Sequence, residues 1–171
     1  FTVTLAALLL AATSTRFATC QAKPASQQFY FEHATKNIPA FEKRHKGGED
    51  AWVAQDDLLV VADGVGGWAD QGVDPALFSK QLCVDIKSIF DKDPNESLKE
   101  VLVSAVKVNP HTGSSTAVLL KFDPTEEDTL LTTNLGDSGY FVFRAQPDDD
   151  FKLRNMYKSK SQQYSFNFPY Q

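Results

Sequence analysis

The chain has 171 residues, of which 42% are hydrophobic and 23% are charged. This length suits one modest domain with a hydrophobic core, and the composition argues against disorder of the whole chain. The formal net charge is −5 and no basic stripe is visible, so we expect no nucleic-acid partner. The two cysteines, Cys20 and Cys83, have neither a CxxC spacing nor a Cys/His cluster, which argues against a structural zinc site.

We interpret residues 1–28 as a leader segment. It contains an apolar run, Leu5–Ala12, that is too short to span a bilayer, so we expect no stable membrane span in the mature chain. Its only charged residues are Arg16 and Lys23, and the first acidic residue is Glu32. The apolar run fits a secretory signal, whereas the acid-poor, hydroxyl-rich composition fits an organelle transit peptide. Both interpretations stay open.

The first half of the remaining chain predicts two strands and a helix. Ala51–Ala54 forms a short strand candidate, and the continuous apolar run Leu58–Ala62 predicts a strand buried on both faces. A glycine-rich turn follows at Gly64–Gly67. Asp74-Pro75 supplies an N-cap and a first-turn proline, and apolar residues at helical spacing extend the predicted helix to about Phe90.

A second helix and then a series of strands follow. The turn Asp93-Pro94-Asn95 opens the second helix, whose apolar face runs from Leu98 to Val106. The spacing then changes to strands separated by short turns, at Ser114–Phe122, Thr129–Asn134, Tyr140–Arg144 and Phe151–Tyr157. Two strands, a helix pair and consecutive hairpins together predict an α+β fold with a largely antiparallel sheet.

Three acidic motifs lie beside strands or in glycine-marked turns. They are Gly47-Gly48-Glu49-Asp50, Asp63-Gly64-Val65-Gly66-Gly67 and Asn134-Leu135-Gly136-Asp137-Ser138-Gly139. A carboxylate at the mouth of a buried strand is desolvated unless it is paired or bound to a cation. Mg²⁺ and Mn²⁺ prefer carboxylate, carbonyl and water oxygens. Each motif alone also suits an ordinary turn, because Asp and Gly both favour turns.

In this order along the chain, and together with Gly113-Ser114-Ser115-Thr116-Ala117, the motifs resemble the type-2C (PPM) family of metal-dependent serine/threonine protein phosphatases. The resemblance covers about residues 45–171. Several further segments look like the mitochondrial-type branch, namely Lys46–Ala51, Gly66-Gly67-Trp68, Gly72–Pro75, Gln162-Gln163-Tyr164 and Phe166–Pro169. The resemblance implies the N-terminal part of a four-layer α/β/β/α sandwich, with residues 29–171 as a partial phosphatase domain.

The resemblance also implies a reaction and its residues. Family members hydrolyse phosphoserine and phosphothreonine with a water activated by two Mn²⁺ or Mg²⁺ ions, and the implied partner is a phosphoprotein. Asp63 matches the catalytic carboxylate that bridges both metals, and Gly64 matches the carbonyl ligand. Glu49 and Asp50 match the acidic pair around metal-bound waters, and Asp137 matches a carboxylate at a third, weaker metal position. A monomer and a mitochondrial location are expected, with the secretory pathway as the alternative.

The sequence departs from the family pattern in three places. Many members have a His at the position of Val65, where it is thought to protonate the leaving group. Many have a phosphate-binding Arg where this chain has His45, so Arg44, His45 and Lys46 are the candidates for that role. Two further metal-ligand aspartates of the family would lie beyond Gln171. An inactive, phosphatase-derived module that binds metal or a partner is therefore the alternative to an active enzyme.

Overall fold

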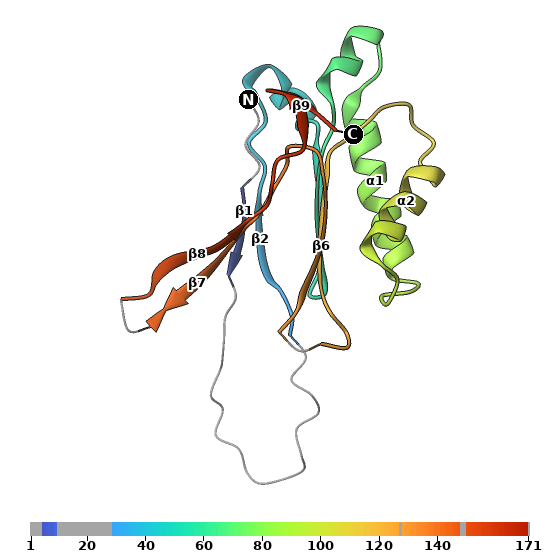
Figure 1. Cartoon of the computed structure of the whole chain (residues 1–171). Helices are drawn as coiled ribbons and strands as arrows, with labels where there is room; N and C mark the ends of the chain where they lie inside the picture. The colour runs from blue at the N-terminus through green and yellow to red at the C-terminus, as the bar shows by residue number, and fades with distance from the viewer. Residues whose placement is uncertain (1–4, 10–28, 127, 148–149, 171) are drawn as a thin grey trace.

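The computed structural model describes residues 5–9, 29–126, 128–147 and 150–170. Its centre is an antiparallel sheet of four strands in the order β3-β4-β5-β6. These strands are β3 (Asp50–Ala54), β4 (Leu58–Asp63), β5 (Ala117–Phe122) and β6 (Leu130–Leu135). Helices α1 (Pro75–Phe90) and α2 (Leu98–Val108) lie together on one face of this sheet (Figure 1). The predicted α+β fold with antiparallel strands is confirmed.

Smaller elements surround the sheet. Strand β1 (Leu5–Leu9) pairs with β2 (Glu32–Lys36), so five residues of the proposed leader form a ladder with the segment that follows it. Two 3-10 helices, η1 (Phe41–Lys46) and η2 (Gly66–Gln71), flank the upper end of the sheet as drawn in Figure 1. Four further strands follow in two antiparallel pairs, β7 (Phe141–Gln146) with β8 (Lys152–Lys158) and β9 (Gln163–Ser165) with β10 (Phe168–Pro169).

The predicted helix boundaries agree closely with the structure. The Asp74 side chain accepts a hydrogen bond from the backbone N–H of Ala76 at 3.1 Å, and α1 ends at Phe90 as expected. Helix α2 begins later than the turn at residues 93–95 suggested, because Ser97 caps it by accepting from Glu100 N–H at 3.2 Å. Local capping chemistry therefore sets both helix starts.

The hydrophobic core lies between the sheet and the two helices. Leu58, Val60 and Ala62 point into it from β4 and are at most 1% exposed. The intervening residues of β4 are only half-buried, so the prediction of a strand buried on both faces is wrong for this face. A smaller cluster around Phe31, Val118 and Leu120 covers part of that second face, and Leu59 packs against it. The alternation gives β4 one fully buried face and one partly covered face.

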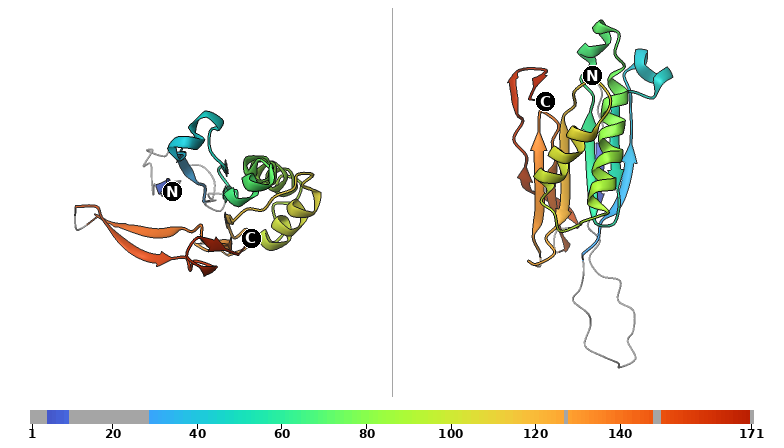
Figure 2. Two further views of the ribbon diagram at one scale, coloured as in Figure 1. Left: turned by 90° about the horizontal axis from the view of Figure 1, so that it is seen from above. Right: turned by 90° about the vertical axis from the view of Figure 1, so that its right-hand side faces the viewer.

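The last predicted strands do not extend the central sheet. Strands β7 and β8 pair only with each other among the described strands, and Figure 2 shows their hairpin reaching away from the helices. The short β9 and β10 pair was not predicted from the sequence. No helix in the described part of the chain is long and apolar enough to cross a bilayer.

Lys121 connects the sheet to the turn before α2, and its loss should destabilise the fold. Its side chain is 2% exposed, and its Nζ donates to the carbonyls of Pro94 at 2.8 Å and Glu96 at 2.6 Å. Lys121→Met leaves these acceptors without their donor, so we expect a loss of about 1–3 kcal/mol in unfolding free energy. Urea denaturation measures it, with the exposed Lys99→Met as the control. Equal stability of the two variants would contradict this role.

Candidate metal site

Three of the predicted acidic residues meet at one end of β3 and β4. Asp50 and Asp63 are direct cross-strand partners, and Glu49 immediately precedes Asp50. The Glu49 carbonyl accepts a hydrogen bond from Gly64 N–H at 3.1 Å, which continues the ladder past the strand end. Glu49 and Asp50 are only 8% and 3% exposed. The register of one hairpin therefore brings together carboxylates that are 13 residues apart in the sequence.

Strand β5 and the residues before it hold Asp63 from the other side. The Asp63 carbonyl accepts from Thr116 N–H and from Ser115 Oγ, each at 3.0 Å. Thr116 Oγ1 in turn accepts from Asp63 N–H at 3.3 Å and lies 2.6 Å from Ser138 Oγ. Ser138 follows Asp137 in the turn after β6. Thr116 thus connects the backbone of Asp63 to the turn that carries Asp137.

Three neighbouring acids and burial together act on the charge of Asp63. The pKa of Asp63 rises from its ordinary 3.8 to about 7, chiefly because burial disfavours the charged form. The negative charge of Asp50 and a hydrogen bond with its carboxyl add to the increase, followed by the charges of Asp137 and Glu49. Such a strongly raised acid in a group of acids is typical of a functional site.

The backbone packs so closely around position 64 that only a glycine fits there. A Cβ at this position would lie 2.6 Å from the Pro75 carbonyl oxygen and 2.9 Å from that of Glu49. Gly64 also forms an isolated bridge with Ser115. The two hydrogen bonds of this bridge come from the neighbouring residues, Val65 N–H to Ser114 O and Thr116 N–H to Asp63 O. The carbonyl of Gly64 itself takes no part in the hydrogen bonds of that bridge.

The donor atoms suit a hard divalent cation, because all of them are oxygens of carboxylates or of a backbone carbonyl. The carboxylates of Asp50, Asp137 and Glu49 lie near enough to raise the pKa of Asp63. Within the described ranges, however, no group of three or more His, Cys, Asp or Glu side chains is gathered in a way that could hold a metal ion. The described residues therefore provide the charge and the donor type of a metal site without a closed set of side-chain ligands.

The predicted phosphate-binding residues lie on η1. Arg44, His45 and Lys46 are all exposed there, and the Arg44 guanidinium lies 5.3 Å from the centre of the Phe41 ring. Their role in binding phosphate stays a prediction.

The basic residue that contacts the acidic site is Lys43, which forms an ion pair with Glu49 and was not predicted. The chain reverses at Gly47 and Gly48, where the Gly48 N–H donates to the Lys43 carbonyl at 3.2 Å. The sequence signal at this place is a basic run followed by two glycines, and it does not single out Lys43. A Cβ at Gly66 would lie 3.1 Å from both Glu49 Oε2 and Lys43 Nζ, so the ion pair sits directly against the η2 turn.

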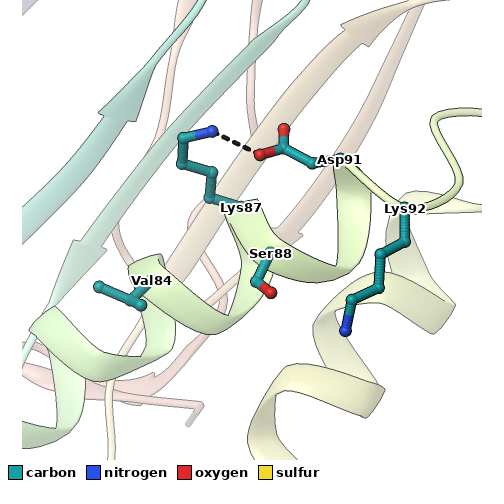
Figure 3. Close-up of a pocket in the computed structure, with 5 residues that line it drawn as sticks. All are labelled: Val84, Lys87, Ser88, Asp91 and Lys92. Carbon is teal, nitrogen blue, oxygen red and sulfur yellow. Dashed lines mark hydrogen bonds and ion pairs between the residues drawn. The ribbon is translucent and has the colours of Figure 1, made fainter.

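Of two cavities in the described part of the chain, one lies away from the acidic residues and one adjoins them. The larger, of about 460 Å³, lies along α1 and is lined by Val84, Lys87, Ser88, Asp91 and Lys92. Figure 3 shows these side chains, with Lys87 paired to Asp91 and none of the site acids among them. The smaller cavity, of about 240 Å³, has Asp137 in its wall and so adjoins the acidic site.

Comparison with known proteins identifies the family of this fold. "Probable protein phosphatase 2C 55" of Arabidopsis thaliana is 36% identical over 138 residues, which cover 78% of this chain and 27% of that protein. "Protein phosphatase PTC7 homolog fig" of Drosophila willistoni is 34% identical over 146 residues, covering 79% and 44%. The X-ray structure of the photosystem II phosphatase PBCP matches with a TM-score of 0.66 and 30% identity, over 77% of this chain and 50% of that one. No protein-family model matches the chain.

The fold and site define an α+β domain built around buried carboxylates at a strand end. With the comparisons, they show that the chain belongs to the type-2C (PPM) family of protein phosphatases. It spans less than half the length of these curated relatives.

The raised pKa of Asp63 predicts a pH-dependent stability of the metal-free protein. Because the folded state holds this proton more tightly than the unfolded state, stability falls as the pH rises from about 4 to 7. Asp63→Asn removes the ionisable group, so in EDTA it should stabilise the fold above pH 7 by about 1–3 kcal/mol and have little effect near pH 4. Urea denaturation at both pH values measures this difference.

Asp57→Asn, in the exposed β3–β4 turn, is the matched control and should show no such pH dependence. Destabilisation by Asp63→Asn above pH 7 would show that the ionised carboxylate is not under strain in the metal-free fold.

Proposed function

We propose that the chain forms part of a protein serine/threonine phosphatase that hydrolyses phosphoserine and phosphothreonine with metal-activated water. The observation that carries this proposal is the position of Asp63, a partly buried acid whose pKa is raised to about 7 by burial and by Asp50, Asp137 and Glu49. A phosphoprotein is the proposed substrate, and we expect the protein to act as a monomer. Family membership supports the reaction class, while the substrate and activity of the whole protein are part of the proposal.

We propose Mn²⁺ or Mg²⁺ as the cofactor, with two ions in the complete site. Bound there, such ions lower the pKa of a water molecule and stabilise negative charge on phosphoryl oxygens. Asp63 is the proposed bridging ligand, with the Gly64 carbonyl as an additional donor. Glu49 and Asp50 would orient bound waters, and Asp137 would serve a weaker position. The ladder of β3, β4 and β5 holds the backbone of these residues before any ion binds.

The basic residues of η1 would attract the phosphate group of the substrate toward the proposed metal site. Arg44, His45 and Lys46 are exposed, so they can meet an approaching anion, and Lys43 already lies against Glu49. Val65 cannot donate a proton to a leaving group, so we expect solvent or bound water to supply it.

Hydrolysis of a generic phosphoester tests the proposal directly. We expect turnover that requires Mn²⁺ and is abolished by EDTA, and a loss of at least about a hundredfold in Asp63→Asn, because the bridging carboxylate is removed. Mn²⁺ should also raise the melting temperature of the unmodified chain but not that of Asp63→Asn. Asp57→Asn is again the control.

Other outcomes would favour a different function. A folded chain that gains stability from Mn²⁺ but turns over no phosphoester would favour the non-catalytic metal- or partner-binding module. Full turnover by Asp63→Asn would remove the assigned role of this residue.

We also propose a mitochondrial location, supported by the acid-poor leader and by the branch resemblance of residues such as Gly66-Gly67-Trp68. A fusion of residues 1–28 to a fluorescent protein should enter mitochondria. Its appearance in the secretory pathway would favour the signal-peptide interpretation.

A further inference from the structure

A small cavity with both polar and apolar walls adjoins the acidic site on the side of β8. Its volume is about 240 Å³, and its wall includes Asp137 from the turn after β6 and Lys158 from the last position of β8. Ser159 and Ser161 add hydroxyl groups, and Phe141 adds an aromatic ring. A cavity that combines a lysine, hydroxyls and one shared wall with the acidic site has the composition of a binding subsite.

The Lys158 ammonium lies over the ring of Phe141, and both residues are exposed. Lys158 and Phe141 are direct cross-strand partners, and Lys158 Nζ lies 5.2 Å from the centre of the Phe141 ring. The ring is itself stacked on Phe143, with centroids 5.8 Å apart and planes inclined by 14°. A cation over an aromatic face is attracted to it, so less side-chain freedom is lost when the ammonium binds an anion.

Two serines add polar groups to the cavity wall. Ser159 Oγ accepts a hydrogen bond from Tyr140 N–H at 2.9 Å, which leaves its own hydroxyl hydrogen out of that bond. This arrangement depends on Gly139, because a Cβ there would lie 2.5 Å from Ser159 Oγ. The backbone of the turn therefore fits closely around the Ser159 hydroxyl.

We propose that this cavity binds an anionic side chain next to the phosphorylated residue of the substrate. The proposal rests on the proposed phosphatase function. In that function the phosphorylated residue reacts at the acidic site, so a flanking residue of the substrate lies beside Asp137, in the adjoining cavity. Lys158 supplies the positive charge, and the hydroxyls of Ser159 and Ser161 supply hydrogen-bond donors. The shared chemistry is an anionic group, which a glutamate, an aspartate or a second phosphorylated residue carries.

Peptide binding tests the subsite without requiring turnover. The probes are fluorescent peptides with a non-hydrolysable phosphoserine mimic and a single Glu, second phosphoserine or Gln at each flanking position, used with the full chain in Mn²⁺. Fluorescence anisotropy gives Kd for each peptide. We expect one flanking position at which Glu or phosphoserine binds about five- to tenfold more tightly than Gln, and the Glu and phosphoserine peptides show which source of the anion is preferred.

Two variants and one control assign the effect to this cavity. Lys158→Met should abolish the preference for the anionic peptides, and Phe141→Leu should reduce it by loosening the ammonium. Lys160→Met removes the same charge two residues away, from a side chain outside the cavity wall, and should retain the preference. A preference that persists in Lys158→Met, or no preference in the unmodified chain, would overturn the subsite.

The same measurements separate this proposal from the phosphatase function. Mn²⁺-dependent hydrolysis without any preference for anionic peptides would overturn the subsite alone. Lys158-dependent binding of acidic peptides that is indifferent to the phosphoserine mimic, in a chain without turnover, would keep the cavity as an anion site and overturn the phosphatase function.

Discussion

The structure depends on one constraint: the Asp63 carboxylate ends a strand whose backbone is fixed on both sides. Hydrogen bonds from Gly64 to Glu49 and from Thr116 to Asp63 hold this strand end between its neighbours. The carboxylate therefore cannot withdraw from Asp50, its cross-strand partner, without breaking the ladder. Its charge has to be balanced by a proton, as the raised pKa shows, or by a cation.

The first turns of α1 pack against this strand end and brace it. The Pro75 carbonyl lies so close to Gly64 that no side chain fits between them. Ser79 is fully buried and donates its hydroxyl hydrogen to the Glu49 carbonyl at 2.5 Å. The N-cap at Asp74 thus sets where the helix begins and, through it, how closely Gly64 and Glu49 are held. A locally encoded helix start in this way fixes acids that come from distant parts of the sequence.

The sequence predicts those features whose causes are local. Asp74-Pro75 fixes one helix start, and the apolar run of β4 predicts its strand, because both signals lie within a few residues. The grouping of the acids followed only from the family resemblance, since it depends on the register between strands. Lys43 and the Thr116–Ser138 contact depend on tertiary packing, and an exposed basic run gives no direct indication of which residue turns inward. The strands of the β7–β8 hairpin were predicted, but their separation from the central sheet was not, because the same alternation also suits strands that extend that sheet.

The same electrostatics imply an order of binding. Glu49, Asp50, Asp63 and Asp137 repel a phosphate group, and Lys43 is the basic residue paired with one of them. Lys158 and the exposed cations of η1 lie at the margins, where they attract an anion without balancing the charge at the centre. A phosphorylated side chain therefore gains little from the central acids until a divalent cation has reversed the local charge. In the proposed function, cation binding is thus the step that converts this acidic strand end into an anion-binding site, and the flanking cations then select which substrate is held.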